Sequence, residues 1–527
     1  MVLSTLSLQE DYWDSFTLEE IDIEFLYNQL METETPLTSQ ELVSTLVTER
    51  LRRERQAIEE ERTSGGDVYL PKVRYAISQK LVFPSLGWRR GQVVSLRPGF
   101  NPDCGNFEVI QVAFENGDTR EYAAALENHA LNDPAPPLEE AASFDPQTVL
   151  EVYGETLIEA MDLGLEAHTD FVRIAGRWFP RALLVDINLG HLNLAEAVLD
   201  MAGGGPLPTS SILEQIELPA NVNPKLLEFS LDLALQEDQR FDEVGPAGIV
   251  LWFLRRLEPE PVLEPPVHLR YPGVEYDREL LSDEMLALER ELDDELSPLE
   301  GKYIHSNEAE IHLIFPHWRS GTLPLASRIR HLFPTAYEAP RIRITLVDGE
   351  SGERFPAWVV RNKRYVYGLK EWYAKRGLQP GSIIRVAGGK KTGEVILHGD
   401  VRRPSREWVR TVLVGSDGGV VFAMLKQTVQ SHYNERMVIA IPDVEALDQV
   451  WASGGKDQLP LERTVVNMVR ELSKLNPQGH VHAIELYAAI NVVRRCPPGP
   501  ILSILAARPW FVHVGDLHFR LTEAERA

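Results

Sequence analysis

Apolar residues along this chain change their spacing several times, which indicates helical segments that alternate with strand-rich ones. In the first segment Ile21, Phe25 and Leu26 recur at the spacing of one helix face. A second apolar stripe begins at Leu42 and runs into a stretch of mixed charge. The pattern predicts a helical, helix-turn-helix-like domain over residues 11–62.

Short strands replace the helices in residues 71–131. Gln92 to Leu96 and Phe107 to Phe114 are strand-like, and Asn116-Gly117-Asp118 is a strong hairpin signal. The segment resembles the small Tudor-like and KOW-like barrels of transcription and chromatin proteins in pattern and length. Asn132 to Pro137, rich in proline, is typical of a linker.

Helical spacing returns in residues 145–258. The candidate helices are Val149 to Leu165, Leu192 to Met201, Ser210 to Ile216 and Lys225 to Leu235. Two short strands around Gly245 and Gly248 follow them, which is the order of a winged-helix-like domain. Residues 259–300 then predict a proline-rich linker and, over 279–300, an acidic helix.

The remaining chain divides into strand-rich residues 301–455 and a largely helical segment, 460–524, which ends in strands. The segments near residues 207 and 479 share one order: a small-residue turn, a short helix, a longer helix and an aromatic hairpin around glycine. Residues 171–179 repeat the hairpin alone. The fold class predicted from this order is multidomain α+β, with tandem winged-helix-like modules and small β-barrel modules.

The C-terminal segment resembles the HARE-type winged helices, a family that includes a domain of the bacterial RNA polymerase delta subunit. The resemblance lies in residues 481–487, Val-His-Ala-Ile-Glu-Leu-Tyr, and in Phe511 to Gly515 with Phe519 to Leu521. A weaker match covers residues 16–62. The resemblance implies contacts in transcription or chromatin, some of them with proteins. Pro497-Pro498-Gly499-Pro500 departs from the family where base-reading residues would lie.

Charge separates one segment from the rest. The chain carries a net charge of −26, yet residues 341–410 hold sixteen Lys/Arg against seven Asp/Glu, an excess of +9 that leaves −35 elsewhere. Acidic surfaces repel phosphate and basic ones attract it. Neither a basic leader nor a run near the ~20 apolar residues of a membrane span occurs. With only two cysteines, Cys104 and Cys496, the composition predicts a cytoplasmic protein without a disulfide framework.

The basic segment is the candidate nucleic-acid surface. Its alternating strand from Arg341, hairpin over 358–369, helix over 370–376 and strand from Leu378 resemble the pseudobarrel DNA-binding domains of plant transcription factors and of some restriction enzymes. Arginine and lysine suit phosphate and guanine, whereas Trp358, Tyr365 and Trp372 are either stacking faces or core residues. The predicted contacts are Arg341, Arg343, Arg361, Lys363, Arg364, Lys370, Lys375, Arg376, Lys390, Lys391, Arg402 and Arg403.

Signals for catalysis or for metal binding are weak. Histidines gather at 305, 312 and 317 and again at 480, 482, 513 and 518, without the cysteines or the convergent spacing of a metal site. Gly388 to Gly393 lacks the spacer of a phosphate-binding loop. Asp293-Asp294-Glu295 is expected to be an exposed, solvated cluster. We therefore predict a protein that is not an enzyme and that takes no cofactor or metal.

These observations predict a DNA-binding or transcription-associated regulator that contacts DNA mainly through its basic β domain. RNA polymerase or another protein is a candidate partner. Two alternatives stay open: a protein-interaction scaffold that uses its winged helices, and a non-catalytic subunit of a DNA restriction or repair system. Charge complementarity also suggests the hypothesis that the acidic helix 279–300 covers the basic segment and inhibits it.

Overall fold

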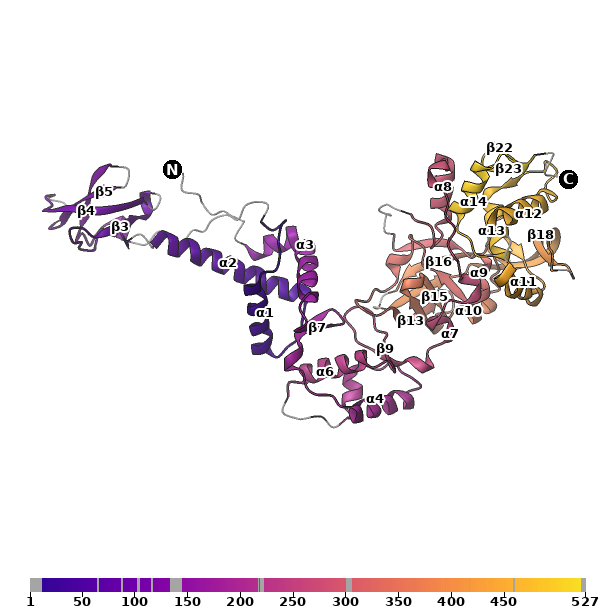
Figure 1. Ribbon diagram of the computed structural model, residues 1–527, viewed down its shortest axis with the longest axis horizontal. Coiled ribbons are helices and arrows are strands. Elements are labelled where there is room, and N and C mark those ends of the chain that lie inside the picture. The colour runs from indigo at the N-terminus through magenta and orange to yellow at the C-terminus, as the bar shows by residue number, and fades with distance from the viewer. Residues whose placement is uncertain are drawn as a thin grey trace. The chain divides into compact units, whose positions relative to one another are not determined.

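A computed structural model shows a mixed α+β protein (Figure 1). The chain forms two compact units, residues 1–173 with 177–184 and residues 174–176 with 185–527. Each unit is described by itself below. The residues that the structure describes are 12–63, 66–86, 89–101, 105–114, 117–132, 145–216, 218, 222–299, 306–389, 391, 393–416, 418–457 and 460–522.

The helical part of the first unit contains three helices and a small sheet. The helices are α1 (Glu20–Thr33), α2 (Ser39–Thr63) and α3 (Pro146–Glu166). The strands β1 (Leu37–Thr38), β7 (Phe171–Ile174) and β8 (Arg177–Pro180) form a sheet in the order β1-β8-β7. The hairpin β7–β8 therefore pairs with a strand that precedes it by well over a hundred residues.

A second sheet lies between α2 and α3 in the sequence. Its strands are β2 (Asp67–Val68), β3 (Lys80–Phe83), β4 (Arg89–Pro98), β5 (Glu108–Phe114) and β6 (Thr119–Ala124), hydrogen-bonded in chain order. After β6, Ala125 N–H donates to the Val73 carbonyl at 3.1 Å and Leu126 N–H to the Pro71 carbonyl at 2.8 Å. These bonds join the two ends of the sheet around a core of stacked aromatic rings.

The second unit begins with helices α4 (Leu189–Met201), α5 (Thr209–Leu213) and α6 (Pro224–Glu237). The hairpin of β9 (Phe241–Glu243) and β10 (Trp252–Leu254) follows, and Leu207 pairs with Trp252 in an isolated bridge. Short helices α7 (Glu260–Leu263) and α8 (Asp283–Leu292) come next.

A seven-stranded sheet forms the middle of the second unit. Its order is β11-β16-β17-β13-β14-β15-β12, and β13 and β17 are its parallel neighbours. Helices α9 (Phe315–Ser320) and α10 (Lys370–Arg376) belong to the same segment. The strands are β11 (Glu308–His312), β12 (Thr322–Pro324), β13 (Arg341–Asp348), β14 (Arg354–Val360), β15 (Tyr365–Tyr367), β16 (Ile383–Gly388) and β17 (Glu394–His398).

The rest of the second unit is a long hairpin and a helical end, which Figure 1 shows in orange and yellow. The hairpin consists of β18 (Val401–Val414) and β19 (Val420–Ser431), and β20 (Ile439–Ala440) pairs with β18. The last elements are α11 (Val444–Asp457), α12 (Leu461–Ser473), β21 (Val481–His482), α13 (Ala483–Val493), α14 (Pro498–Ala507), β22 (Phe511–Gly515) and β23 (His518–Leu521).

One order of elements occurs three times: helix, short strand, two helices, hairpin, with the single bridge residue Leu207 in place of the short strand in one of them. We call these repeats one (α1–β8, with the sheet β2–β6 inserted), two (α4–β10) and three (α12–β23). The registers agree, because the short strand pairs with the last strand in each: Leu37 with Trp178, Leu207 with Trp252, and Val481 with Phe519.

A buried hydrogen-bonded triad occupies the same place in repeats one and two. In repeat one, Trp178 Nε1 donates to Ser39 Oγ at 3.1 Å and to Asp162 Oδ1 at 3.0 Å. The Ser39 hydroxyl also donates to Asp162. A buried indole N–H needs such an acceptor, because leaving it unpaired costs about 1–3 kcal/mol.

Repeat two builds the triad from Thr209, Asp232 and Trp252. Trp252 Nε1 donates to Thr209 Oγ1 at 3.1 Å and to Asp232 Oδ1 at 2.9 Å. In repeat three the strand position holds Phe519 and the helix start holds Ala483, both buried and apolar. In repeat three, apolar residues thus replace both the tryptophan and the hydroxyl residue of the triad.

The predicted helices near Val149–Leu165, Leu192–Met201 and Lys225–Leu235 are confirmed as α3, α4 and α6. Their grouping differs from the predicted domains. Helix α3 and the hairpin over 171–180 pack with the N-terminal helices, not with residues 189–254. The two-residue strand β1 carries the pairing, and so short a strand has no visible period.

Prediction on Asp232. Burial raises the pKa of Asp232 to about 7, although hydrogen bonds from Thr209 and Trp252 act in the opposite direction. The folded protein then holds this proton at pH values where the unfolded chain has lost it. The contribution of Asp232 to the free energy of unfolding therefore falls as the pH rises from about 4 to about 7.

Asp232→Asn should remove this pH dependence, because an amide does not titrate. Denaturant unfolding at several pH values between 4.5 and 7.5 measures it, and the wild type should lose stability relative to the variant across that range. Asp200→Asn, at an exposed acid, is the control. A constant difference between wild type and Asp232→Asn would contradict the prediction.

Candidate nucleic-acid interface

Many of the predicted contact cations are paired with acids inside the fold. Arg341 forms ion pairs with Asp242 and Glu258, and its side chain is only 12% exposed. Lys375 Nζ lies 2.6 Å from Glu353 Oε1. Arg376 pairs with Asp348 and Glu350. Burial by itself would raise the pKa of Asp348, yet Arg376 and backbone amides hold it well below its ordinary value. Arg341 and Arg376 are thus held inside the fold, whereas the ion pair of Lys375 with Glu353 lies at the surface.

Four further cations have partners within the protein. The Arg343 guanidinium lies 4.8 Å from the centre of the buried Trp358 ring, and burial lowers the pKa of Arg343. Arg361 donates to the Ala339 carbonyl and Arg364 to the Glu295 carbonyl, each at 2.9 Å. Arg402 pairs with Glu407 at 2.8 Å.

The sequence left two interpretations for three aromatic residues: stacking faces or core residues. The side chains are buried, with exposed fractions of 1% for Trp358, 2% for Tyr365 and 4% for Trp372. The core assignment is therefore confirmed. Their rings take no part in a surface that nucleic acid could reach.

Lys363, Lys370, Lys391 and Arg403 are exposed and form no ion pair with the residues that the structure describes. Lys363 and Lys391 lie at the end of the seven-stranded sheet where β13 begins, because β14 runs antiparallel to β13 and β17 runs parallel to it. Arg376 reaches Asp348, at the opposite end of β13. Lys390 lies outside the described residues. The twelve predicted residues do not form one surface.

A different surface gathers free cations: the hairpin of β18 and β19, residues 401–431, which we call the ribbon. Arg406 pairs with Thr428, Trp408 with Lys426, and Arg410 with Met424. Directly opposed residues lie on the same face of an antiparallel pair, and every second pair shares that face. These three pairs therefore form one face of the ribbon.

That face combines an exposed aromatic ring with cations. Trp408 is 62% exposed, and Lys426 Nζ lies 5.4 Å from the centre of its ring. Arg406 and Lys426 of this face are exposed, as is Arg403 further along β18, where the register with β19 is interrupted; among the described residues none of the three pairs with an acid. Arginine and lysine attract phosphate, and an aromatic face stacks on bases.

The ribbon is fixed in the second unit close to its turn, where Val412 pairs with Phe422 on the same face as Trp408. Val412 and Phe422 lie in the same apolar core as the helices of repeat three. Arg410 donates to Glu485 Oε1 of α13 at 2.7 Å and to the Arg436 carbonyl at 2.6 Å. The part of this face that carries Arg406, Trp408 and Lys426 is thus exposed on a rigid element, which suits a binding surface.

Sequence reasoning ended the contact set at Arg403 and missed Arg406, Trp408 and Lys426. A local signal for two of them exists, because Arg406, Trp408 and Arg410 alternate with Glu407 and Val409 as a strand does. Lys426 follows only from the cross-strand register.

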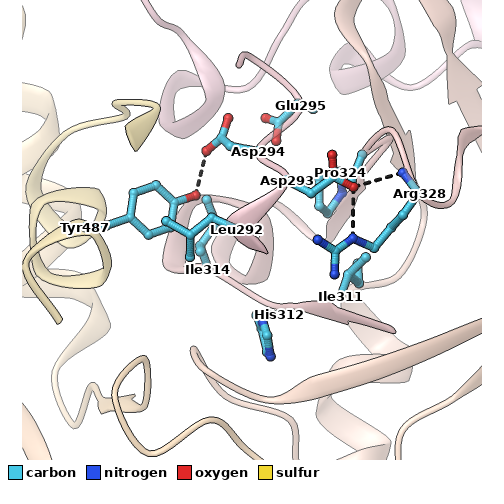
Figure 2. A pocket seen from close by; sticks show the side chains of 11 residues that line it. Leu292, Asp293, Asp294, Glu295, Ile311, His312, Ile314, Pro324, Arg328 and Tyr487 are labelled. Carbon is cyan, nitrogen blue, oxygen red and sulfur yellow. Dashed lines mark hydrogen bonds and ion pairs between the residues drawn. The ribbon is translucent and has the colours of Figure 1, made fainter. Parts of the chain in front are cut away.

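The acids at 293–295 are buried, so the prediction of an exposed, solvated cluster was wrong. Figure 2 shows Asp294 reaching Tyr487 and Asp293 reaching Arg328 around a small pocket. Its cavity of about 20 Å³ has room for about one water molecule, not a substrate.

Arg495 explains why these acids are buried. Its side chain is fully buried, and its Nη2 lies 2.6 Å from Asp294 Oδ1 and 2.7 Å from Glu295 Oε1. His317 Nε2 also lies 3.0 Å from Glu295. Burial alone would raise the pKa of Glu295, yet Arg495 and His317 hold it well below its ordinary value. The cluster joins repeat three to the segment before the seven-stranded sheet.

The acidic segment 279–300 reaches one predicted contact cation, because Arg364 donates to the Glu295 carbonyl, and the inhibition hypothesis stays a hypothesis. Its helical part is only α8, and Leu281, Met285 and Leu288 share a core with Ile501 and Leu502 of α14. Packing against apolar residues fixes this segment, because a helix with one apolar face must bury it.

The histidines of repeat three come together, but their hydrogen bonds do not fit a metal. Ligand atoms of His482, Asp516 and His518 lie within 4.8 Å of one another. However, His482 Nδ1 accepts the Ile484 N–H at 3.1 Å, and Arg436 lies 3.1 Å from its Nε2. A neutral imidazole offers one lone pair, and the helix start uses it. Burial next to Arg436 also lowers the pKa of His482 to about 4.

Of the histidines at 305, 312 and 317, the last two lie within the described residues. His317 is buried between Thr322 and Glu295, and burial lowers the pKa of His312. His305 and Cys104 lie outside the described residues. Cys496 is buried.

Comparison with models of protein families, with curated proteins and with solved structures finds no match to this chain. Within the described residues, no helix has the length and apolar character needed to cross a membrane.

Prediction on Arg495. Arg495→Met leaves Asp294 and Glu295 buried without their cation, so the free energy of unfolding should fall by about 3–5 kcal/mol. The control is Arg508→Met, which removes an exposed arginine that pairs with Glu462 and should cost less than about 1 kcal/mol. Denaturant unfolding compares the two. Equal losses would show that the buried cluster does not join the two segments.

Proposed function

We propose that this protein is a non-enzymatic nucleic-acid-binding protein that contacts its ligand through the exposed part of the ribbon face that carries Trp408. The observation that carries the proposal is the exposed Trp408 beside Lys426 and Arg406 on a rigid hairpin. Phosphate contacts supply most of the affinity of such surfaces, and exposed aromatic rings supply stacking.

The charge distribution supports the ribbon as the site of contact. Residues 401–431 hold five Lys/Arg and two Asp/Glu, a charge of +3, and the rest of the chain then carries −29. A phosphate backbone is repelled by the acidic remainder and attracted by the ribbon. This differs from the wider basic surface predicted over 341–410, where structural ion pairs neutralise much of the charge.

The helices of the three repeats do not support base reading. We propose that the repeats are winged-helix modules, in which the last helix before the hairpin would enter a major groove. Helix α3 carries five acids and no cation, and α6 carries three acids and one lysine. Helix α14 has no charged residue, and most of it is buried. Repeat three therefore supports the ribbon, and the last helices of the three repeats offer no basic surface of their own.

Protein binding is the second candidate function, and α3 favours it. Val152 and Leu163 of this helix are 66% and 64% exposed among its acids. An exposed acidic and apolar helix suits a basic protein partner. A role in transcription, with RNA polymerase as that partner, rests on the HARE-type resemblance, and a restriction or repair subunit remains the further alternative.

Prediction on the ribbon. Arg403→Glu, Arg406→Glu and Lys426→Glu together should weaken binding of labelled oligonucleotides by the full chain at least tenfold at low salt. The slope of log affinity against log salt should also decrease by about 2–3, because up to three phosphate contacts are lost.

The matched control reverses Lys363, Lys370 and Lys391, which changes the net charge equally at exposed positions outside the ribbon. Fluorescence anisotropy across a salt series measures both variants. If the control loses as much affinity as the ribbon variant, the site is wrong. If the wild type does not bind at low salt, the function is wrong.

A further inference from the structure

Trp408 differs from the tryptophans that are buried in the cores of the protein. Trp178, Trp252 and Trp358 are at most 2% exposed and belong to the packed interior. Trp408 is 62% exposed and lies in none of the apolar cores formed by the described residues. An exposed indole contributes little to folding, so a role in stability does not explain it.

Two of the neighbours of Trp408 on its face are cations, and a third, Met424, is apolar and 40% exposed. Lys426 lies over the ring, and Arg406 occupies the next position on the same face of β18. The ring is therefore held by a cation–π contact while much of it stays open to solvent. A flat, open aromatic face between positive charges is the arrangement that stacks a base and neutralises the adjacent phosphates.

We infer that the ribbon binds single-stranded nucleic acid, with an unpaired base stacked on Trp408. This inference rests on the proposed function and names its ligand class. In a duplex the bases are already stacked on one another, so Trp408 could not stack without unstacking a base step. A single strand offers its base faces directly, whatever their sequence.

Duplex binding is the competing arrangement, because a two-stranded ribbon also fits a major groove. Groove reading requires side chains that donate to or accept from base edges. The middle of this face instead carries an indole whose ring lies against Lys426. The geometry thus favours stacking over reading of edges.

The test uses the full chain and labelled oligonucleotides of about 15 nucleotides, near the upper site size of one small single-strand-binding domain. The probes are single-stranded DNA, single-stranded RNA, the matching DNA duplex and an abasic DNA strand of equal charge. The variants are Trp408→Leu and Trp408→Phe. No other tryptophan is changed, including Trp318, which donates to the Leu378 carbonyl.

Single strands should bind at least tenfold more tightly than the duplex. Trp408→Leu should lower single-strand affinity about 5- to 150-fold, the change that matches one stacked base. Trp408→Phe should keep most of the affinity, because phenylalanine also stacks. Binding of the abasic strand should be the same for all three proteins.

The outcomes separate the two proposals. Equal affinity of wild type and Trp408→Leu for single strands, or duplex binding as tight as single-strand binding, overturns the inference. If the ribbon charge variant still reduces binding in that case, the proposed function stands. If no probe binds to the wild type, both fail. A preference between DNA and RNA would identify which single strand the ribbon takes.

Discussion

The buried ion pairs of Arg495 are the interaction on which the second unit depends. A fully buried guanidinium is costly unless acids pair with it, and Asp294 with Glu295 supplies that pairing. Because Arg495 belongs to repeat three and the acids precede the seven-stranded sheet, the pairs hold these segments together. The ribbon packs on repeat three through Val412 and Phe422. Its exposed face is therefore presented on a fixed support.

The same balance of charge explains which cations are available for binding. In an acidic chain, most arginines of the basic segment find an acid inside the fold, as Arg341 and Arg376 do. Cations that remain exposed and unpaired among the described residues, such as Arg403 and Arg406, are then more informative than a local count of charge. The segment 341–410 with its +9 excess overlaps the proposed ribbon site only over residues 401–410.

Sequence periodicity predicted the elements better than their partners. Helices α3, α4 and α6 have clear apolar stripes in the sequence. The bounds predicted from these stripes therefore agree closely with the observed bounds. The pairing of Leu37 with Trp178 spans the inserted sheet, and no local pattern records it. Asp294 and Glu295 have the composition of a solvated segment, because their partner Arg495 lies 201 and 200 positions later. Both the strand pairing and the burial of these acids depend on residues that are distant in the sequence.

The candidate site was predicted in part for the same reason. Arg402 and Arg403 were in the predicted set, and the strand that carries them continues to Trp408. That Trp408 is exposed whereas Trp358 is buried depends on which face of each strand meets a core, and alternation alone does not tell the two faces apart. The triads show the same limit, because Ser39, Asp162 and Trp178 meet only in the folded repeat.

Hydrogen–deuterium exchange of the full chain, with and without a single-stranded oligonucleotide, tests the central claim most directly. The account predicts slower exchange in peptides that cover residues 401–431, and unchanged exchange in α3 and α6. Slower exchange in α3 or α6 with an unchanged ribbon would contradict it.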